Sequence, residues 1–144
     1  MDVVDLAKRS EMMAGIKSKN TRPEMVVRKF LHSQGFRYRL HSRKLPGSPD
    51  LILPKYKIAI FVHGCFWHRH VGCKYATNPS SNAERWAAKF HGNIERDAKN
   101  EVALRALGWS VLIVWECELR AAETNRLDLL IRQILKHDLP NLTG

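Results

Sequence analysis

The chain has 144 residues, and its 24 Lys and Arg against 14 Asp and Glu give a formal net charge of +10. This length allows one compact domain, and the 44% hydrophobic and 26% charged residues exclude a disordered or fibrous protein. The positive charge indicates a polyanionic partner, and no apolar run approaches the roughly 18 residues that a membrane span needs.

The first half of the sequence predicts a helix followed by three strands. Residues 6–16 can form a short helix with basic flanks, and we expect residues 1–20 to act as an N-terminal arm. Thr21-Arg22-Pro23-Glu24 is a capping box that starts a helix, which Gly35 ends. Alternating or β-branched runs then predict an antiparallel meander of strands at residues 36–40, 51–53 and 57–62.

A long irregular segment follows the third predicted strand. Residues 63–81 show no periodicity and are rich in Cys, His and aromatic residues. Such a long segment without secondary structure needs a stabilising feature of its own. Ile94, Ala98 and Val102 then fall on one face of a helix that Gly108 ends.

The last part of the chain predicts a strand and a helix. Residues 109–115 are almost continuously apolar, as in a strand covered on both faces, and Thr124 can cap a final helix. The order α, three β, α, β, α predicts an α/β fold. Its mixed β-sheet is flanked by helices, and a right-handed crossover joins the last strand.

Three cysteines and two histidines form a candidate metal site. Cys65, His68, His70 and Cys73 lie within nine positions, and Cys117 follows the last predicted strand. A structural zinc ion needs four ligands, which the three cysteines and one of the histidines would supply. Alternatively, the thiols are small buried side chains and the imidazoles make ordinary hydrogen bonds. Spacing does not decide which histidine binds.

Asp50 is the candidate for catalysis. It begins a predicted strand beside the end of the strand that closes near His63, where a carboxylate can hold Mg²⁺ for phosphodiester hydrolysis. Pro-Asp is also a common turn pair. His63 and His68 are suited to accept a proton from water. Glu24 either reaches the same edge or serves its helix cap.

Aromatic residues stand among basic ones in and after the irregular segment. Phe66, Trp67 and Trp86 lie near Arg69 and Lys89, and such rings can stack on bases or wedge into a duplex. Unstacking costs least free energy at a mismatched pair, so a wedge would select mismatched over perfectly paired duplex. The alternative for Phe66 and Trp67 is packing around a zinc loop.

Four segments carry a resemblance to a known family: LPGSPD at 45–50, IFVHGCFWH at 60–68, NIERD at 93–97 and GWSVLIVWEC at 108–117. Together they closely resemble the very short patch repair (Vsr-type) DNA mismatch endonucleases. The resemblance implies a restriction-endonuclease-like fold, with residues 21–144 as a single endonuclease domain. It also implies a Mg²⁺-dependent hydrolase that nicks one strand of duplex DNA beside the thymine of a T·G mismatch. In that family, such mismatches arise by deamination of 5-methylcytosine, and the nick starts very short patch repair.

The resemblance also implies roles for individual residues. Asp50 would bind Mg²⁺ together with the main-chain carbonyl of Val62, and His68 would act as the base toward water. Glu24 and His63 would organise the phosphate and the waters around the ion. Structural Zn²⁺ would be held by Cys65, His70, Cys73 and Cys117.

DNA contacts are implied in the same way. The wedge aromatics would be Phe66, Trp67 and Trp86. Met13 of the arm would enter from the opposite groove, and Lys89 and Asn93 would read the mispair. In the wider nuclease superfamily, an acidic residue and a lysine are usual where this sequence has Phe61 and His63, so a second carboxylate ligand is missing.

We therefore expect a monomeric, cytoplasmic, nucleoid-associated enzyme that acts on double-stranded DNA with a T·G mismatch. No export signal is recognisable at the start of the sequence. Mismatch-repair proteins are further candidate partners. Two alternatives remain: a nuclease that cuts a specific unmodified site in perfect duplex, and a non-catalytic zinc-containing DNA-binding module. The presence of Asp50 with His63 and His68 favours an enzyme.

Overall fold

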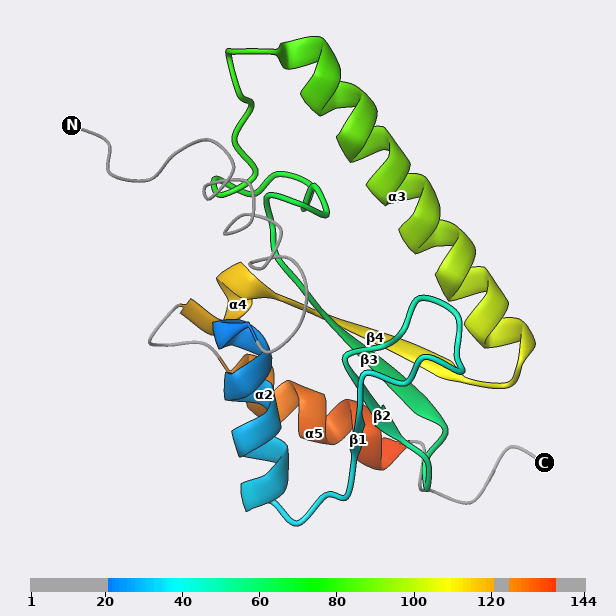
Figure 1. The fold of residues 1–144 in the computed structure, drawn as a ribbon. Helices are drawn as coiled ribbons and strands as arrows, with labels where there is room; N and C mark the ends of the chain where they lie inside the picture. Colours follow the sequence, from blue (N-terminus) through cyan, green and yellow to red (C-terminus); the bar gives the residue numbers. More distant parts are fainter. Residues whose placement is uncertain (1–20, 121–124, 137–144) are drawn as a thin grey trace, which may run out of the picture.

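The structure, a computed structural model, describes residues 21–120 and 125–136, and its elements follow the predicted order with one additional short helix after the last strand (Figure 1). They are α2 (Arg22–Ser33), β1 (Arg39–Leu40), β2 (Leu51–Leu53), β3 (Ile58–His63), α3 (Ala83–Ala106), β4 (Ser110–Trp115), α4 (Glu116–Arg120) and α5 (Arg126–Lys136). The predicted arm at residues 1–20, its Met13, and Thr124 lie outside the described residues.

The strands form one mixed sheet in the order β1-β2-β3-β4. The first three strands pair antiparallel and β4 pairs parallel with β3, so the predicted meander and the added fourth strand are confirmed. Strand β1 is shorter than predicted, because the Phe36 N–H donates to the Leu31 carbonyl and ties the chain to the end of α2. Leu51 lies opposite Ile60, so the start of β2 lies beside the end of β3.

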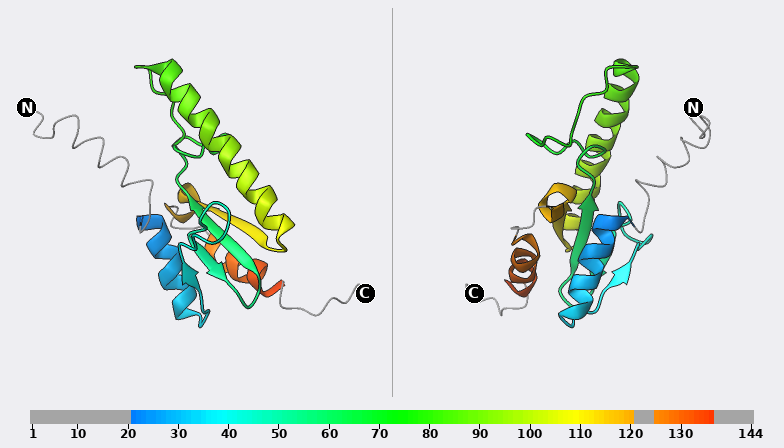
Figure 2. Two further views of the ribbon diagram at one scale, coloured as in Figure 1. Left: turned by 45° about the vertical axis from the view of Figure 1, so that its right-hand side comes forward. Right: turned by 90° about the vertical axis from the view of Figure 1, so that its left-hand side faces the viewer.

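Helices cover both faces of this sheet, as Figures 1 and 2 show. Alternate strand residues such as Leu51, Ile60 and Val114 pack with buried residues of α2 and α5. Their neighbours Ile52, Ala59 and Val111 form a second core with Leu104 of α3 on the other face. Alternate residues along each strand therefore pack on opposite faces of the sheet, one face against α3 and the other against α2 and α5.

Helix α3 buries a different face from the one that its apolar residues mark. Ile94 is 47% and Val102 68% exposed. The inward side chains at helical spacing are Phe90, Asn93, Asp97, Asn100 and Leu104, of which the middle three are polar. Hydrophobic periodicity indicates this helix but not its buried face, because the inward face carries polar contacts.

Gly47 controls the approach of the loop before Asp50 to α3. Its φ is +78°, and an added Cβ would lie 2.9 Å from the Asn100 Cβ, whereas Gly35 has a φ of +84° with open space around it. Gly35→Ala should therefore lower the free energy of unfolding by about 1 kcal/mol, because of its backbone conformation alone. Gly47→Ala should lower the free energy of unfolding by about 1–3 kcal/mol more, because the added Cβ overlaps the side chain of Asn100. Urea unfolding measures both, and equal losses would contradict the contact with α3.

Candidate active site and metal centre

The candidate active site lies where β2 begins and β3 ends. The Val62 N–H donates to Asp50 Oδ2 at 2.7 Å. The N–H and C=O of one strand residue point to the same edge, so the Val62 carbonyl also faces the side of Asp50. The β-sheet register thus brings the two predicted Mg²⁺ ligands together, although they are far apart in sequence.

The Asp50 carboxyl is costly to ionise in the folded protein. Its pKa is raised from 3.8 to about 6, mainly by burial and also by the charge of Glu24, while the Val62 N–H and the charges of His41 and His68 oppose the shift. Glu24 itself is 1% exposed. A cation would stabilise the partly buried Asp50 carboxyl beside the buried carboxyl of Glu24.

Asp50→Asn should stabilise the protein at neutral pH without added magnesium. Between the unfolded pKa of 3.8 and the folded pKa of about 6, the folded state binds more protons, so its stability falls as the pH rises. The uncharged amide escapes this loss, which amounts to up to about 3 kcal/mol at pH 7. Urea unfolding should show a higher free energy of unfolding for Asp50→Asn than for wild type at neutral pH, and little difference between them below about pH 4. A gain of equal size at both pH values would contradict the pKa shift as its cause.

Glu24 extends from the first turn of α2 into the same site. Its N–H donates to the Thr21 Oγ1 at 3.3 Å, as a capped helix requires. Its carboxylate lies 2.9 Å from His41 Nε2 and 3.4 Å from Arg28 Nη1. Glu24, His41 and Asp50 each offer one ligand atom, and these atoms all lie within 4.8 Å of one another. The cap and the contact with the site therefore coexist.

His63 and His68 stand beside this group. Their rings stack with centroids 3.8 Å apart and planes within 4°. His68 Nδ1 lies 2.6 Å from Asp97 Oδ2 of α3. His63 is buried, and its Nδ1 has no hydrogen-bond partner within residues 21–120 and 125–136. Burial, together with the nearby His68, lowers the pKa of His63 to about 3, so this imidazole is neutral.

The stacked arrangement suits proton transfer better than metal binding. His63, His68 and Asp97 also offer ligand atoms within 4.8 Å of one another. Imidazole lone pairs lie in the ring plane, so two parallel stacked rings cannot both direct them at one ion. An Nδ1–H bonded to Asp97 instead leaves the Nε2 of His68 as an acceptor.

Two polar residues of this site lack a role in the sequence-based prediction. Asp97 lies in one of the segments that carry the family resemblance, four positions after Asn93. Helical spacing could therefore have indicated that Asp97 and Asn93 share one face of the helix. His41 gave no local signal, because it reaches Glu24 only through the folding of β1 against β2.

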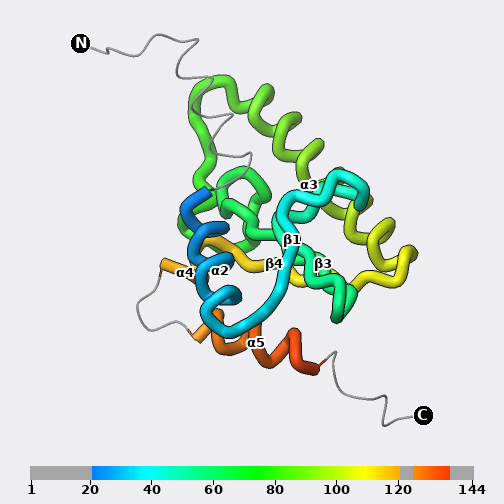
Figure 3. Tube along the Cα trace, turned by 60° about the horizontal axis from the view of Figure 1, so that its bottom comes forward, coloured from blue at the N-terminus to red at the C-terminus, as the bar shows by residue number. Residues whose placement is uncertain are grey.

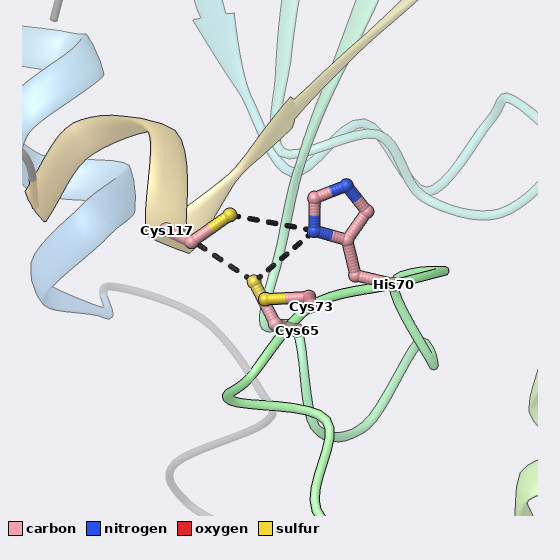
Figure 4. A group of neighbouring side chains, drawn as sticks. All are labelled: Cys65, His70, Cys73 and Cys117. Carbon is pink, nitrogen blue, oxygen red and sulfur yellow. Dashed lines mark hydrogen bonds between the residues drawn. The ribbon is translucent and has the colours of Figure 1, made fainter.

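A second cluster joins the three thiols to one imidazole. Cys65, His70, Cys73 and Cys117 offer ligand atoms within 4.8 Å of one another (Figure 4). His70 Nδ1 lies 3.7 Å from Cys65 Sγ and 3.3 Å from Cys117 Sγ. Tetrahedral bonds to zinc place neighbouring S and N ligands about 3.6 Å apart. The cluster therefore contains His70, and His68 belongs to the pair with Asp97.

The polypeptide around these thiols is consistent with a structural metal centre. Cys65 follows β3 and Cys117 lies in α4, so the cluster joins the long loop to the sheet (Figures 1 and 3). The His70 ring stacks on Trp115 with centroids 4.2 Å apart. Burial raises the pKa of the Cys65 thiol to about 12, so a metal ion would have to displace its proton on binding.

The predicted wedge aromatics form one cluster over the loop and the start of α3. The Phe66 ring lies 5.1 Å from Trp67, 5.5 Å from Trp86 and 5.2 Å from Phe90. Lys89 Nζ lies 5.1 Å from the Trp67 ring and 5.6 Å from the Trp86 ring. Trp67 is mostly buried, whereas Phe66 and Trp86 are partly exposed. Ring packing and a basic group thus occur on the same surface.

Asn93 supports this loop from α3. It is 6% exposed, and its amide donates to the Trp67 carbonyl at 3.1 Å. Its role in reading a mispair stays a prediction, and so does that of Lys89. Within the described part of the chain, no helix combines the length and apolar character needed to cross a membrane.

The chain is similar in sequence to known proteins. The family model described as DNA mismatch endonuclease Vsr matches residues 1–74. Type II nicking enzyme V.NmeAIP of Neisseria meningitidis is 47% identical over 135 residues, covering 92% of this chain and 96% of the relative. Type II nicking enzyme V.XorIIP of Xanthomonas oryzae is 46% identical, covering 89% and 92%. DNA mismatch endonuclease Vsr of Escherichia coli is 43% identical, covering 85% and 78%.

Proposed function

The chain belongs to the Vsr family of DNA mismatch endonucleases, and we propose that it nicks one strand of duplex DNA beside the thymine of a T·G mismatch. Such mismatches would arise by deamination of 5-methylcytosine, and the nick would start very short patch repair. The observation that carries the proposal is Asp50 beside Glu24 and close to the His68–Asp97 pair. The names of two relatives, type II nicking enzymes, favour cleavage of a single strand.

Asp50 and the main-chain carbonyl of Val62 would hold Mg²⁺, and the partly buried carboxyl of Asp50 beside the buried carboxyl of Glu24 fits a hard cation. When bound, the ion supplies positive charge for the scissile phosphate and lowers the pKa of water. Glu24 would orient water through its carboxylate. The neutral His63, whose Nδ1 is buried without a partner in the described residues, would contact water or phosphate.

His68 would accept the proton of the attacking water at Nε2. Asp97 holds the opposite ring nitrogen at 2.6 Å, which fixes the tautomer and would stabilise the imidazolium that forms. His68 lies close enough to influence the pKa of Asp50, so base and carboxylate act in one site. Asp97 is thus a positioning residue that acts through His68.

Asp97→Asn should lower the nicking rate by about 10²-fold. An amide that donates to Nδ1 favours the wrong tautomer of His68 and cannot stabilise its charged form. Single-turnover nicking measures the loss. Glu95→Gln is the matched control, because Glu95 is an exposed carboxylate on the same helix that pairs with exposed His91. An unchanged rate in Asp97→Asn, with zinc content and stability also unchanged, would contradict this role.

Mismatch selectivity would come from the aromatic cluster. Phe66, Trp67 and Trp86 would wedge into the duplex, and the unstacking cost would favour a weakened T·G pair. Lys89, exposed beside the two indoles, and Asn93 would read the mispair. Met13 of an arm at residues 1–20 would contact the opposite groove.

We further propose that Cys65, His70, Cys73 and Cys117 hold a structural zinc ion. Their donor set and spacing fit tetrahedral coordination. We also propose that residues 21–144 form one restriction-endonuclease-like domain. The protein would act as a monomer at the bacterial nucleoid, with mismatch-repair proteins as candidate partners.

Duplexes that differ only in one T·G or T·A pair test the function. Each strand is labelled separately and incubated with zinc-loaded protein and Mg²⁺. We expect a nick only in the strand with the mispaired thymine. Equal cutting of the T·A duplex would favour a nuclease for a specific unmodified site. Binding without cleavage would favour a non-catalytic zinc module.

A further inference from the structure

His41 occupies a strained position opposite Asp50. It directly follows β1, and its φ is +46°, in the left-handed region that side chains with a Cβ disfavour. Its N–H donates to the Asp50 carbonyl at 3.0 Å, continuing the pairing of β1 with β2. Strained residues that are held in this way cluster at functional sites.

The His41 ring is directed at the buried carboxylate of Glu24, beside Asp50. Its Nε2 lies 2.9 Å and 3.1 Å from the two Glu24 carboxylate oxygens. One ligand atom from each of Glu24, His41 and Asp50 falls within a mutual distance of 4.8 Å. Neighbouring ligands of an octahedral ion with bonds of about 2.1 Å lie about 3.0 Å apart, so the Glu24–His41 spacing suits a shared cation.

Building on the proposed function, we propose that His41 supplies a nitrogen ligand to the divalent cation that Asp50 would hold beside Glu24, and that this ligand makes the site prefer Mn²⁺ to Mg²⁺. Mg²⁺ strongly favours oxygen ligands, whereas imidazole binds the transition metals, among which Mn²⁺ also accepts carboxylates. His41 would thus influence which cation occupies the site.

The competing explanation is that His41 only donates a hydrogen bond that orients Glu24. Two substitutions separate these roles. His41→Gln keeps an N–H donor for Glu24 but has no ring nitrogen. His41→Asn removes the imidazole with a residue that tolerates left-handed φ, so backbone strain does not confound the result. His91→Gln is the matched control, because His91 is exposed on α3 and pairs with Glu95.

The test is Mn²⁺ binding to zinc-loaded protein, followed by electron paramagnetic resonance. Zinc keeps Mn²⁺ out of the thiol cluster. We expect ¹⁴N coupling to bound Mn²⁺ in wild type and in His91→Gln, and its loss in both His41 variants. Loss of an outer-shell partner alone typically weakens metal binding about 10- to 100-fold, so the His41 variants should lose at least that much Mn²⁺ affinity. Their Mg²⁺ affinity should fall less.

Absence of ¹⁴N coupling in wild type, or its persistence in His41→Gln, would overturn the assignment. Equal losses of Mn²⁺ and Mg²⁺ affinity would overturn the preference. Nicking of T·G duplex with Mg²⁺ is measured on the same preparations. If wild type nicks but shows no ¹⁴N coupling, only the role of His41 fails. If the coupling appears and is lost with His41 but T·G duplex stays uncut, the metal site stands and the proposed substrate fails.

Discussion

Asp50→Ala should lower the rate of Mg²⁺-dependent nicking by about 10³-fold or more, because a catalytic metal contributes several kcal/mol and each 1.36 kcal/mol is tenfold in rate. Asp50 supplies the carboxylate ligand of the proposed Mg²⁺ site, beside the main-chain carbonyl of Val62. The aromatic and basic surface remains intact, so binding to a T·G duplex should stay within a few-fold of wild type. Single-turnover nicking and a binding titration measure the two quantities.

Two variants exclude trivial causes of such a loss. Asp128→Ala removes an exposed carboxylate of α5 and should nick at the wild-type rate. Asp50→Asn should lose activity like Asp50→Ala while being more stable than wild type in buffer without added magnesium, so unfolding cannot explain its inactivity. If Asp50→Ala nicks normally, the assignment of Asp50 is wrong.

Cys117→Ser should lose most of its zinc and much of its stability. Structural zinc sites contribute on the order of 10 kcal/mol or more to folding, which matches or exceeds the whole stability of a typical domain. Cys117 is also the member of the cluster that lies beyond β4, so its loss detaches the loop from the sheet. Elemental analysis should give about one zinc per wild-type chain, and thermal unfolding measures the loss of stability.

Cys117→His is the matched control, because it exchanges one ligand for another and should keep part of the zinc and of the stability. Wild-type protein that is folded and active without zinc would contradict a structural role for the cluster. Retention of zinc by Cys117→Ser would place the metal elsewhere.

Most of the fold could be predicted from local sequence signals. Thr21 caps α2 as the capping box indicates, a β-branched run marks β3, and short apolar runs mark β2 and β4. The short α4 was missed, because five residues carry too little periodicity. The exposed side of α3 was also unexpected. Its inward face carries Asn93, Asp97 and Asn100, so apolar spacing cannot reveal it.

The candidate site was only partly accessible from sequence. Sequence spacing identified the cysteines as candidate metal ligands. It did not show whether His68 or His70 completes the site, because both lie in the same short segment. The family resemblance assigns His70 to the thiols, and the fold separates the two rings in the same way, since Asp97 of α3 engages His68. The contacts of Asp97 and His41 cross 29 and 17 positions of the sequence, so no local pattern encodes them.

The central claim, that a divalent cation on Asp50 performs the cleavage beside a separate zinc centre, is most directly tested by anomalous diffraction. Crystals of the zinc-containing protein soaked in Mn²⁺ should show a zinc peak among Cys65, His70, Cys73 and Cys117. A separate manganese peak should touch Asp50 and the Val62 carbonyl. An Asp50 carboxylate that is turned away from any peak, or cysteines without a metal between them, would contradict the claim.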